Sequence, residues 1–150
     1  MLERSPEVSV AYRTLFILWV SFAGFQIFLF LLTWISEPES FNLTASKTFL
    51  GDNALLILFI SLESVYALVI SIRWHSKYIK KAVAEQKPEY VQTAMIIGAA
   101  LAMSVSLWGV FLALAFEYAY SFIWMIVGFV ATCLHFPSRR DLEAASMKTQ

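Results

Sequence analysis

The residue best suited to chemistry is Glu63, a carboxylate at the midpoint of an apolar stretch between Asn53 and Arg73. Roughly 20 apolar residues in a helix span a bilayer's hydrocarbon core, which is about 30 Å thick. A charged group at that depth costs roughly 2.5–3.5 kcal/mol on insertion scales, so it should face protein or a water-filled cavity. The stretch therefore predicts a membrane helix over about 53–74 with Glu63 turned away from lipid.

A helical projection supports this orientation, because successive side chains are about 100° apart. One sector holds mostly small and polar residues: Asn53, Ile60, Glu63, Ser64, Ala67 and Ser71. The opposite sector is aliphatic: Leu55, Leu58, Leu62, Val65, Val69 and Ile72. The sequence thus predicts one packed face and one lipid face.

Two hypotheses for Glu63 stay open. In the first, Glu63 binds a proton or cation, with Ser64 and Tyr66 as neighbouring candidates. In the second, the carboxyl is structural and is hydrogen-bonded to a hydroxyl on another helix, such as that of Ser104 or Ser106. A single carboxyl supplies no pathway across a membrane, which favours the structural alternative.

A stripe of small residues follows one side of the next apolar stretch, 90–116. Its members are Ala94, Gly98, Ala102, Ser106 and Gly109, with Ala113 continuing the same side. Small residues at such spacing let membrane helices approach closely. The stripe predicts a packing seam, whose partner is either another helix of this chain or another subunit.

Two histidines, His75 and His135, lie at corresponding ends of two predicted helices. Two histidines at similar depth can bind a haem axially. The simpler interpretation, which we favour, is that both are interfacial residues next to Lys and Arg. The single Cys133 excludes a cysteine-based metal cluster, and no hydrolase, metalloprotease or nucleotide-binding motif is present. We therefore expect no enzymatic activity, no metal and no cofactor.

Composition places the whole chain in a membrane. Of its 150 residues, 59% are hydrophobic and 15% charged, whereas soluble domains carry about 25% charged residues. The zero net charge gives no basic field for nucleic acid. The expected fold is all-α: a single transmembrane domain over 1–150, with four helices in two hairpins. The expected helices are about 11–34, 53–74, 90–116 and 119–135, followed by a tail over 136–150.

The basic residues predict the orientation. All eleven Lys and Arg residues except Lys47 lie in the N-terminal segment, the connection between the second and third helices, or the tail. Because short cytoplasmic loops are enriched in Lys and Arg, both termini should be cytoplasmic. We expect an integral membrane protein of this orientation, in a bacterial inner membrane.

The two-hairpin layout, the LESVYALV segment around Glu63 and the small stripe together resemble the proteolipid ring subunits of rotary ATPases, in their four-helix form. That resemblance implies a proton- or cation-translocating role for Glu63. The chain departs from the family in two ways. Its first helix holds only Gly24 in place of the family's repeated glycines. The family's carboxylate hairpin also turns on the cytoplasmic side, whereas the charges of this chain place the loop between the first two helices outside. The chain also resembles small uncharacterised four-helix bacterial membrane proteins that end in a sequence like Phe136-Pro-Ser-Arg-Arg140.

The function that these observations favour is that of a non-enzymatic membrane subunit. It would work by helix packing, as a homo-oligomer or as an accessory part of a larger inner-membrane complex. Its expected partners are the lipid bilayer and other copies of itself or other membrane subunits, not nucleic acid. The alternatives are a proteolipid-like translocating subunit using Glu63 and, less favoured, a haem-carrying membrane anchor using His75 and His135.

Overall fold

The computed structural model describes residues 6–41, 49 and 53–146, and these are helical nearly throughout. The elements are α1 (Pro6–Ser36), the single 3₁₀ turn η1 (Pro38–Phe41), α2 (Ala54–Glu85), α3 (Glu89–Phe116), α4 (Phe122–Leu134) and α5 (Arg139–Ser146). Most of the connection between α1 and α2 lies outside the described residues, as do the two ends of the chain. The prediction of an all-helical fold is confirmed for the described part.

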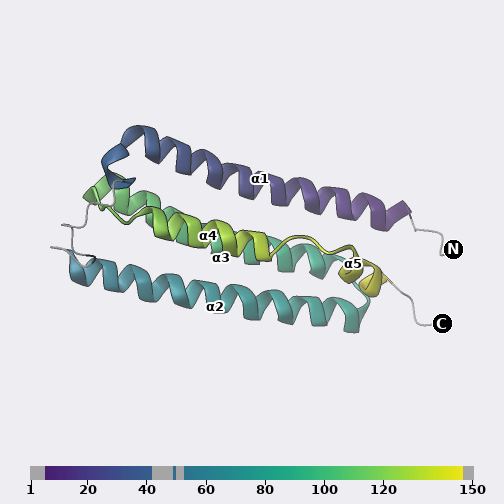
Figure 1. Cartoon of the computed structure of the whole chain (residues 1–150). Helices are drawn as coiled ribbons and strands as arrows, with labels where there is room; N and C mark the ends of the chain where they lie inside the picture. The colour runs from purple at the N-terminus through teal and green to yellow at the C-terminus, as the bar shows by residue number, and fades with distance from the viewer. Residues whose placement is uncertain (1–5, 42–48, 50–52, 147–150) are drawn as a thin grey trace.

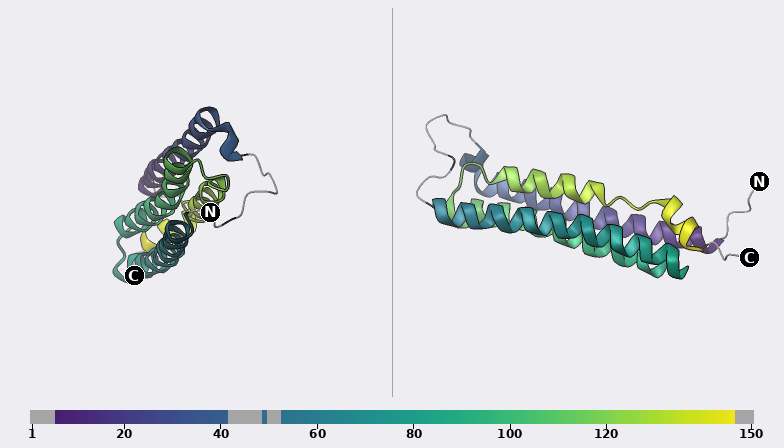
Figure 2. Two further views of the ribbon diagram at one scale, coloured as in Figure 1. Left: turned by 90° about the vertical axis from the view of Figure 1, so that its left-hand side faces the viewer. Right: turned by 90° about the horizontal axis from the view of Figure 1, so that it is seen from below.

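Helix α3 is the centre of the bundle. It packs against α2, α4 and α1, and α1 and α2 lie on opposite sides of it (Figures 1 and 2). Two apolar clusters occupy the two ends of the bundle. One contains Leu15, Ala82, Val91, Met95, Leu142 and Ala145, and the other contains Ile57, Ile60, Ala67, Val105, Leu112 and Trp124. The start of α1 and the end of α5 lie at the same end of the bundle (Figure 1).

Three of the described helices, α1, α2 and α3, are long and apolar enough to cross a membrane. The predicted fourth span is different, because α4 has 13 residues, about 20 Å of helix at 1.5 Å per residue, against a hydrocarbon core of about 30 Å. Taken together as one span bent by 40°, α4 and α5 are also long and apolar enough to cross a membrane. The described chain therefore supports three spans, or four if the bent pair counts as one.

The ends of α4 explain why it is shorter than the predicted 119–135. Helix α3 ends at Phe116. The next residue, Glu117, has a left-handed backbone (φ 49°), and residues 118–121 form a turn before α4 begins at Phe122. At the other end, His135 leaves the helix two residues before Pro137, whose ring is incompatible with a continuing helix. Helix α2 continues past its predicted membrane-spanning part, 53–74, to Glu85, as the helical spacing of the basic segment predicts.

The predicted tail is largely the packed helix α5. Leu142 and Ala145 are buried in the cluster at that end of the bundle. The Arg139 guanidinium lies 4.3 Å from the Tyr12 ring centre, and the Phe136 and Trp19 ring centres are 4.9 Å apart. Residues 136–146 therefore pack against the bundle, including α1, and do not form a free tail.

Candidate functional site

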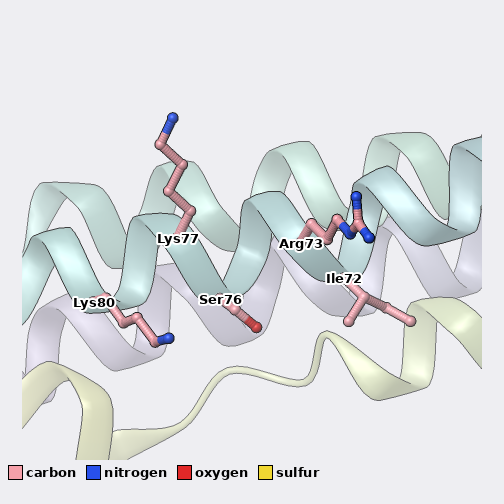
Figure 3. Close-up of a pocket in the computed structure, with 5 residues that line it drawn as sticks. All are labelled: Ile72, Arg73, Ser76, Lys77 and Lys80. Carbon is pink, nitrogen blue, oxygen red and sulfur yellow. The ribbon is translucent and has the colours of Figure 1, made fainter.

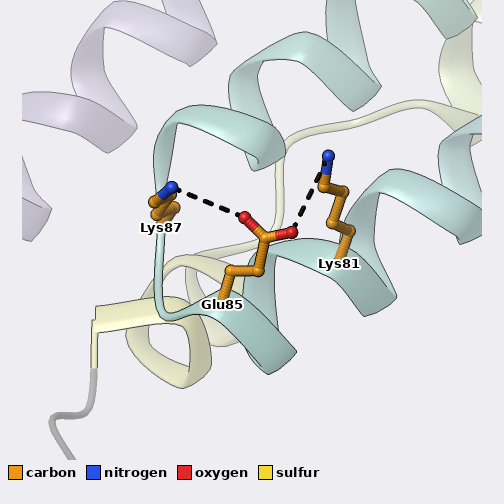
Figure 4. A network of polar contacts seen from close by, with 3 residues as sticks. All are labelled: Lys81, Glu85 and Lys87. Atoms are coloured by element: carbon orange, nitrogen blue, oxygen red, sulfur yellow. Dashed lines mark ion pairs between the residues drawn. The ribbon is translucent and has the colours of Figure 1, made fainter.

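Glu63 lies on α2 and faces α3, where the Trp108 indole N–H donates a hydrogen bond to its Oε2. The side chain is half-buried. No cation neutralises it: among the described residues, ion pairs join only Lys81 and Lys87 to Glu85, far along the same helix (Figure 4). The structure thus holds a carboxyl group in the middle of the apolar part of α2, with one indole donor and incomplete cover.

The two residues grouped with Glu63 do not complete a binding site. Tyr66 is 66% exposed, and in the described part of the chain no hydrogen bond joins it to Glu63. Ser64 is buried against α3, and its hydroxyl has no hydrogen-bond partner among the described residues. Glu63 is therefore the one member of this group that presents a carboxyl oxygen at the surface between α2 and α3.

The expected hydroxyl partners of Glu63 bond elsewhere. Ser104 Oγ donates to the Leu101 carbonyl oxygen at 2.7 Å, and Ser106 faces the opposite side of α3. The actual donor, Trp108, was missed by the sequence reasoning. The sequence did hold a signal for this bond: Trp108 lies within an apolar segment, where its indole N–H needs an acceptor.

The packed and lipid faces predicted for α2 agree with the burial of its residues. Ile60 and Ser71 are completely buried, and Ser64 and Ala67 are about 5% exposed. On the other face the exposed fraction of the side chains is large: Leu55 84%, Leu58 62%, Leu62 70%, Val65 59%, Val69 42% and Ile72 53%. Asn53, at the start of the helix, is exposed.

The small stripe of α3 lies against α4 of the same chain. Gly128 of α4 fits against Ala102 and Ser106, so closely that a Cβ at Gly128 would lie 2.7 Å from the Ala102 carbonyl oxygen. A Cβ at Gly109 would lie 2.7 Å from the Ser121 carbonyl oxygen. Ala94, Gly98, Ala102, Ser106 and Gly109 are all buried. Of the two partners left open by the sequence, the described structure places an internal helix on the stripe.

A buried polar network joins α1 to this seam. Gln26 Nε2 donates to Thr132 Oγ1 at 2.6 Å, and Gln26 Oε1 accepts from Ser106 Oγ at 2.8 Å. The Thr132 hydroxyl donates onward to the Gly128 carbonyl oxygen, and Trp19 Nε1 donates to the Thr132 carbonyl oxygen. The nitrogen and the oxygen of the Gln26 amide therefore each have a partner inside the bundle, so this network fixes helix positions.

His135 is buried within the bundle, which the interpretation as an interfacial residue next to Lys and Arg did not predict. Its exposed fraction is 2%, and its ring lies on Gly98, where a Cβ would be 2.6 Å from Nε2. Nδ1 is 2.7 Å from the Ala131 carbonyl oxygen, so Nδ1 carries a proton and donates it. Nε2 is 2.9 Å from Ser71 Oγ, which also lies 3.2 Å from the Gly98 carbonyl oxygen. His135 thus connects α2, α3 and α4.

The two histidines do not fit a haem. A haem bound axially by both would stand between the two rings, but the rings contact each other edge to face, with centres 5.1 Å apart. Both nitrogens of His135 already have hydrogen-bond partners. The described residues also contain no group of three His, Cys, Asp or Glu side chains placed to hold a metal ion.

No protein-family model, curated protein or solved structure matches this chain.

Proposed function

We propose that this protein is a non-enzymatic integral membrane subunit that works by helix packing. It acts as a homo-oligomer or as an accessory component of a larger inner-membrane complex. The three long apolar helices and the exposed aliphatic face of α2 support its place in a bilayer.

The incomplete cover of Glu63 carries this proposal. In a bilayer a carboxylate at the middle of a span costs a few kcal/mol unless protein or water surrounds it. Here α3 supplies one donor, Trp108, and covers only part of the side chain. The neighbouring surface is apolar and exposed, with Leu62 at 70% and Phe111 at 43%. A helix of another subunit that covers this surface and offers a hydrogen-bond donor to Glu63 would remove the cost.

The small-residue seam is not available to such a partner. Gly109, Ala102 and Ser106 are already in contact with α4. The partner must therefore approach the surface between α2 and α3 around Glu63, away from α4.

For the orientation, we propose that both termini and the connection between α2 and α3 face the cytoplasm. Reporter fusions after Lys81 and after Gln150 are expected to give cytoplasmic signals, and a fusion near Ser46 a signal from outside, because nearly all Lys and Arg residues lie on one side. A cytoplasmic signal at Ser46 would reverse the proposed orientation. It would also favour the proteolipid alternative, whose carboxylate hairpin turns on the cytoplasmic side.

A second candidate function is proton or cation translocation through Glu63. One observation favours it: the carboxylate has no cationic partner among the described residues and stays partly open, as a site that binds and releases a proton or cation requires. The resemblance to proteolipid ring subunits points the same way.

The variant Glu63→Gln separates the two functions, because glutamine keeps the size and an acceptor oxygen for the Trp108 N–H but cannot exchange a proton. We expect unchanged assembly size, and proton and sodium flux in reconstituted vesicles equal to that of the wild type. Glu117→Gln, which neutralises an exposed carboxylate at the end of α3, is the matched control. A wild type that conducts and an assembled Glu63→Gln that does not would make translocation the function.

A further inference from the structure

A hollow on the outer surface of α2 is lined by basic side chains. Its volume is about 430 Å³, and its lining residues are Ile72, Arg73, Ser76, Lys77 and Lys80 (Figure 3). In this view Lys77 points to one side of the helix, Ile72, Ser76 and Lys80 lie on the other side, and Arg73 extends along the helix. The lining therefore offers three cations and one hydroxyl, and no carboxylate.

These three cations are not used by the protein itself. In the described chain the lysines that form ion pairs are Lys81 and Lys87, which lie 3.7 and 3.5 Å from the Glu85 carboxylate (Figure 4). Lys81 also lies over the Tyr90 ring. Arg73, Lys77 and Lys80 are exposed and have no acidic partner in the described part. Three cations without an acidic partner, spread over about two helical turns, attract an anion with several acceptor oxygens, such as a phosphate.

The position of the hollow favours a lipid over a soluble anion. The exposed aliphatic face of α2 runs through Val65 and Val69 to Ile72, which forms the apolar edge of the hollow, and the charged segment begins at Arg73. The exposed Trp74 lies at the same level, and tryptophan favours the membrane–water interface. A phospholipid whose chains follow the aliphatic face would place its phosphate among the three cations.

We propose that the hollow formed by Ile72, Arg73, Ser76, Lys77 and Lys80 binds the phosphate of an anionic phospholipid, with the acyl chains along the aliphatic face of α2. Basic residues at the end of a membrane helix also set topology, which depends on the total charge of the segment. Binding depends instead on the lysines that line the hollow, so two variants of equal charge distinguish the two roles.

The test is a titration of the detergent-solubilised full chain with short-chain phosphatidylglycerol, with binding measured by thermophoresis. Phosphatidylcholine of the same chain length and inorganic phosphate serve as comparison ligands. We expect saturable binding of phosphatidylglycerol that is weakened about tenfold or more in Lys77→Gln/Lys80→Gln. The matched control, Lys81→Gln/Lys87→Gln, removes the same charge outside the hollow and is expected to change the affinity less than about twofold.

Three results would overturn the proposal: no saturable binding of phosphatidylglycerol, equal weakening in both double variants, or inorganic phosphate binding as tightly as the lipid. The last would make the hollow a site for soluble anions. Circular dichroism checks that each variant stays helical. If the first double variant loses helix, the single variant Arg73→Gln carries the same test, because its side chain is exposed and lines the same hollow.

Discussion

Replacing Gly128 with alanine is expected to destabilise the bundle by roughly 1–3 kcal/mol, the usual effect of overpacking a close contact. The new Cβ would lie 2.7 Å from both the Ala102 carbonyl oxygen and the Ser106 backbone nitrogen. Both atoms belong to the backbone of α3, so the contact is relieved only if the two helices move apart. That movement would also lengthen the bonds between Ser106, Gln26 and Thr132.

The matched control is Gly24→Ala in α1, where the added Cβ would have no atom within 4 Å apart from its chain neighbours and its own helix backbone. Alanine is favoured over glycine inside a helix by about 1 kcal/mol, so this variant should be as stable as the wild type or more stable. The measurement is the midpoint of thermal unfolding of the purified full chain in mild detergent. Equal midpoints for the two variants would show that α3 and α4 do not pack as described.

Replacing Gly98 with leucine is expected to expel His135 from its buried position. Even a Cβ at this position would be 2.6 Å from the imidazole Nε2, and a leucine fills the space of the ring. Displacing the His135 ring would break its hydrogen bond with Ser71, which connects α2 to the end of α4. Diethylpyrocarbonate, which modifies accessible imidazoles, should therefore react with His75 alone in the wild type, and with both histidines in Gly98→Leu.

The control for this variant is Ala100→Leu, because Ala100 is exposed on the same helix. It adds the same side chain without entering the seam, so His135 should stay protected. Rapid modification of His135 in the wild type would contradict its burial. Full protection in Gly98→Leu would show that the ring does not depend on the space left by the missing Cβ.

The sequence predicted the features that depend on helical periodicity. In α2, small residues recur every three or four positions and so fall on one face of the helix, with aliphatic residues on the other. The burial of Ser64, Ala67 and Ser71 agrees with this prediction. The buried stripe of α3 follows from the same periodicity. Neither feature requires knowledge of the partner helix.

The features that depend on long-range contacts were missed. The end of α3 at Glu117 has a left-handed backbone without the glycine that usually marks it, so the short α4 gave no clear signal. The burial of His135 requires Gly98 and Ser71, which are 37 and 64 residues away in the chain. The Trp108 bond to Glu63 likewise joins two helices whose relative rotation no single-helix pattern defines.

The central claim, that another protein subunit covers the surface around Glu63, is tested most directly by photocrosslinking in the membrane. A benzoylphenylalanine is placed at Tyr66, one turn from Glu63 and 66% exposed, and for comparison at Phe28, which is 57% exposed on α1 across the bundle from α2 (Figure 1). We expect a discrete crosslinked protein band from position 66 and none from position 28. Crosslinks to lipid alone from position 66, or the same protein band from both positions, would contradict the claim.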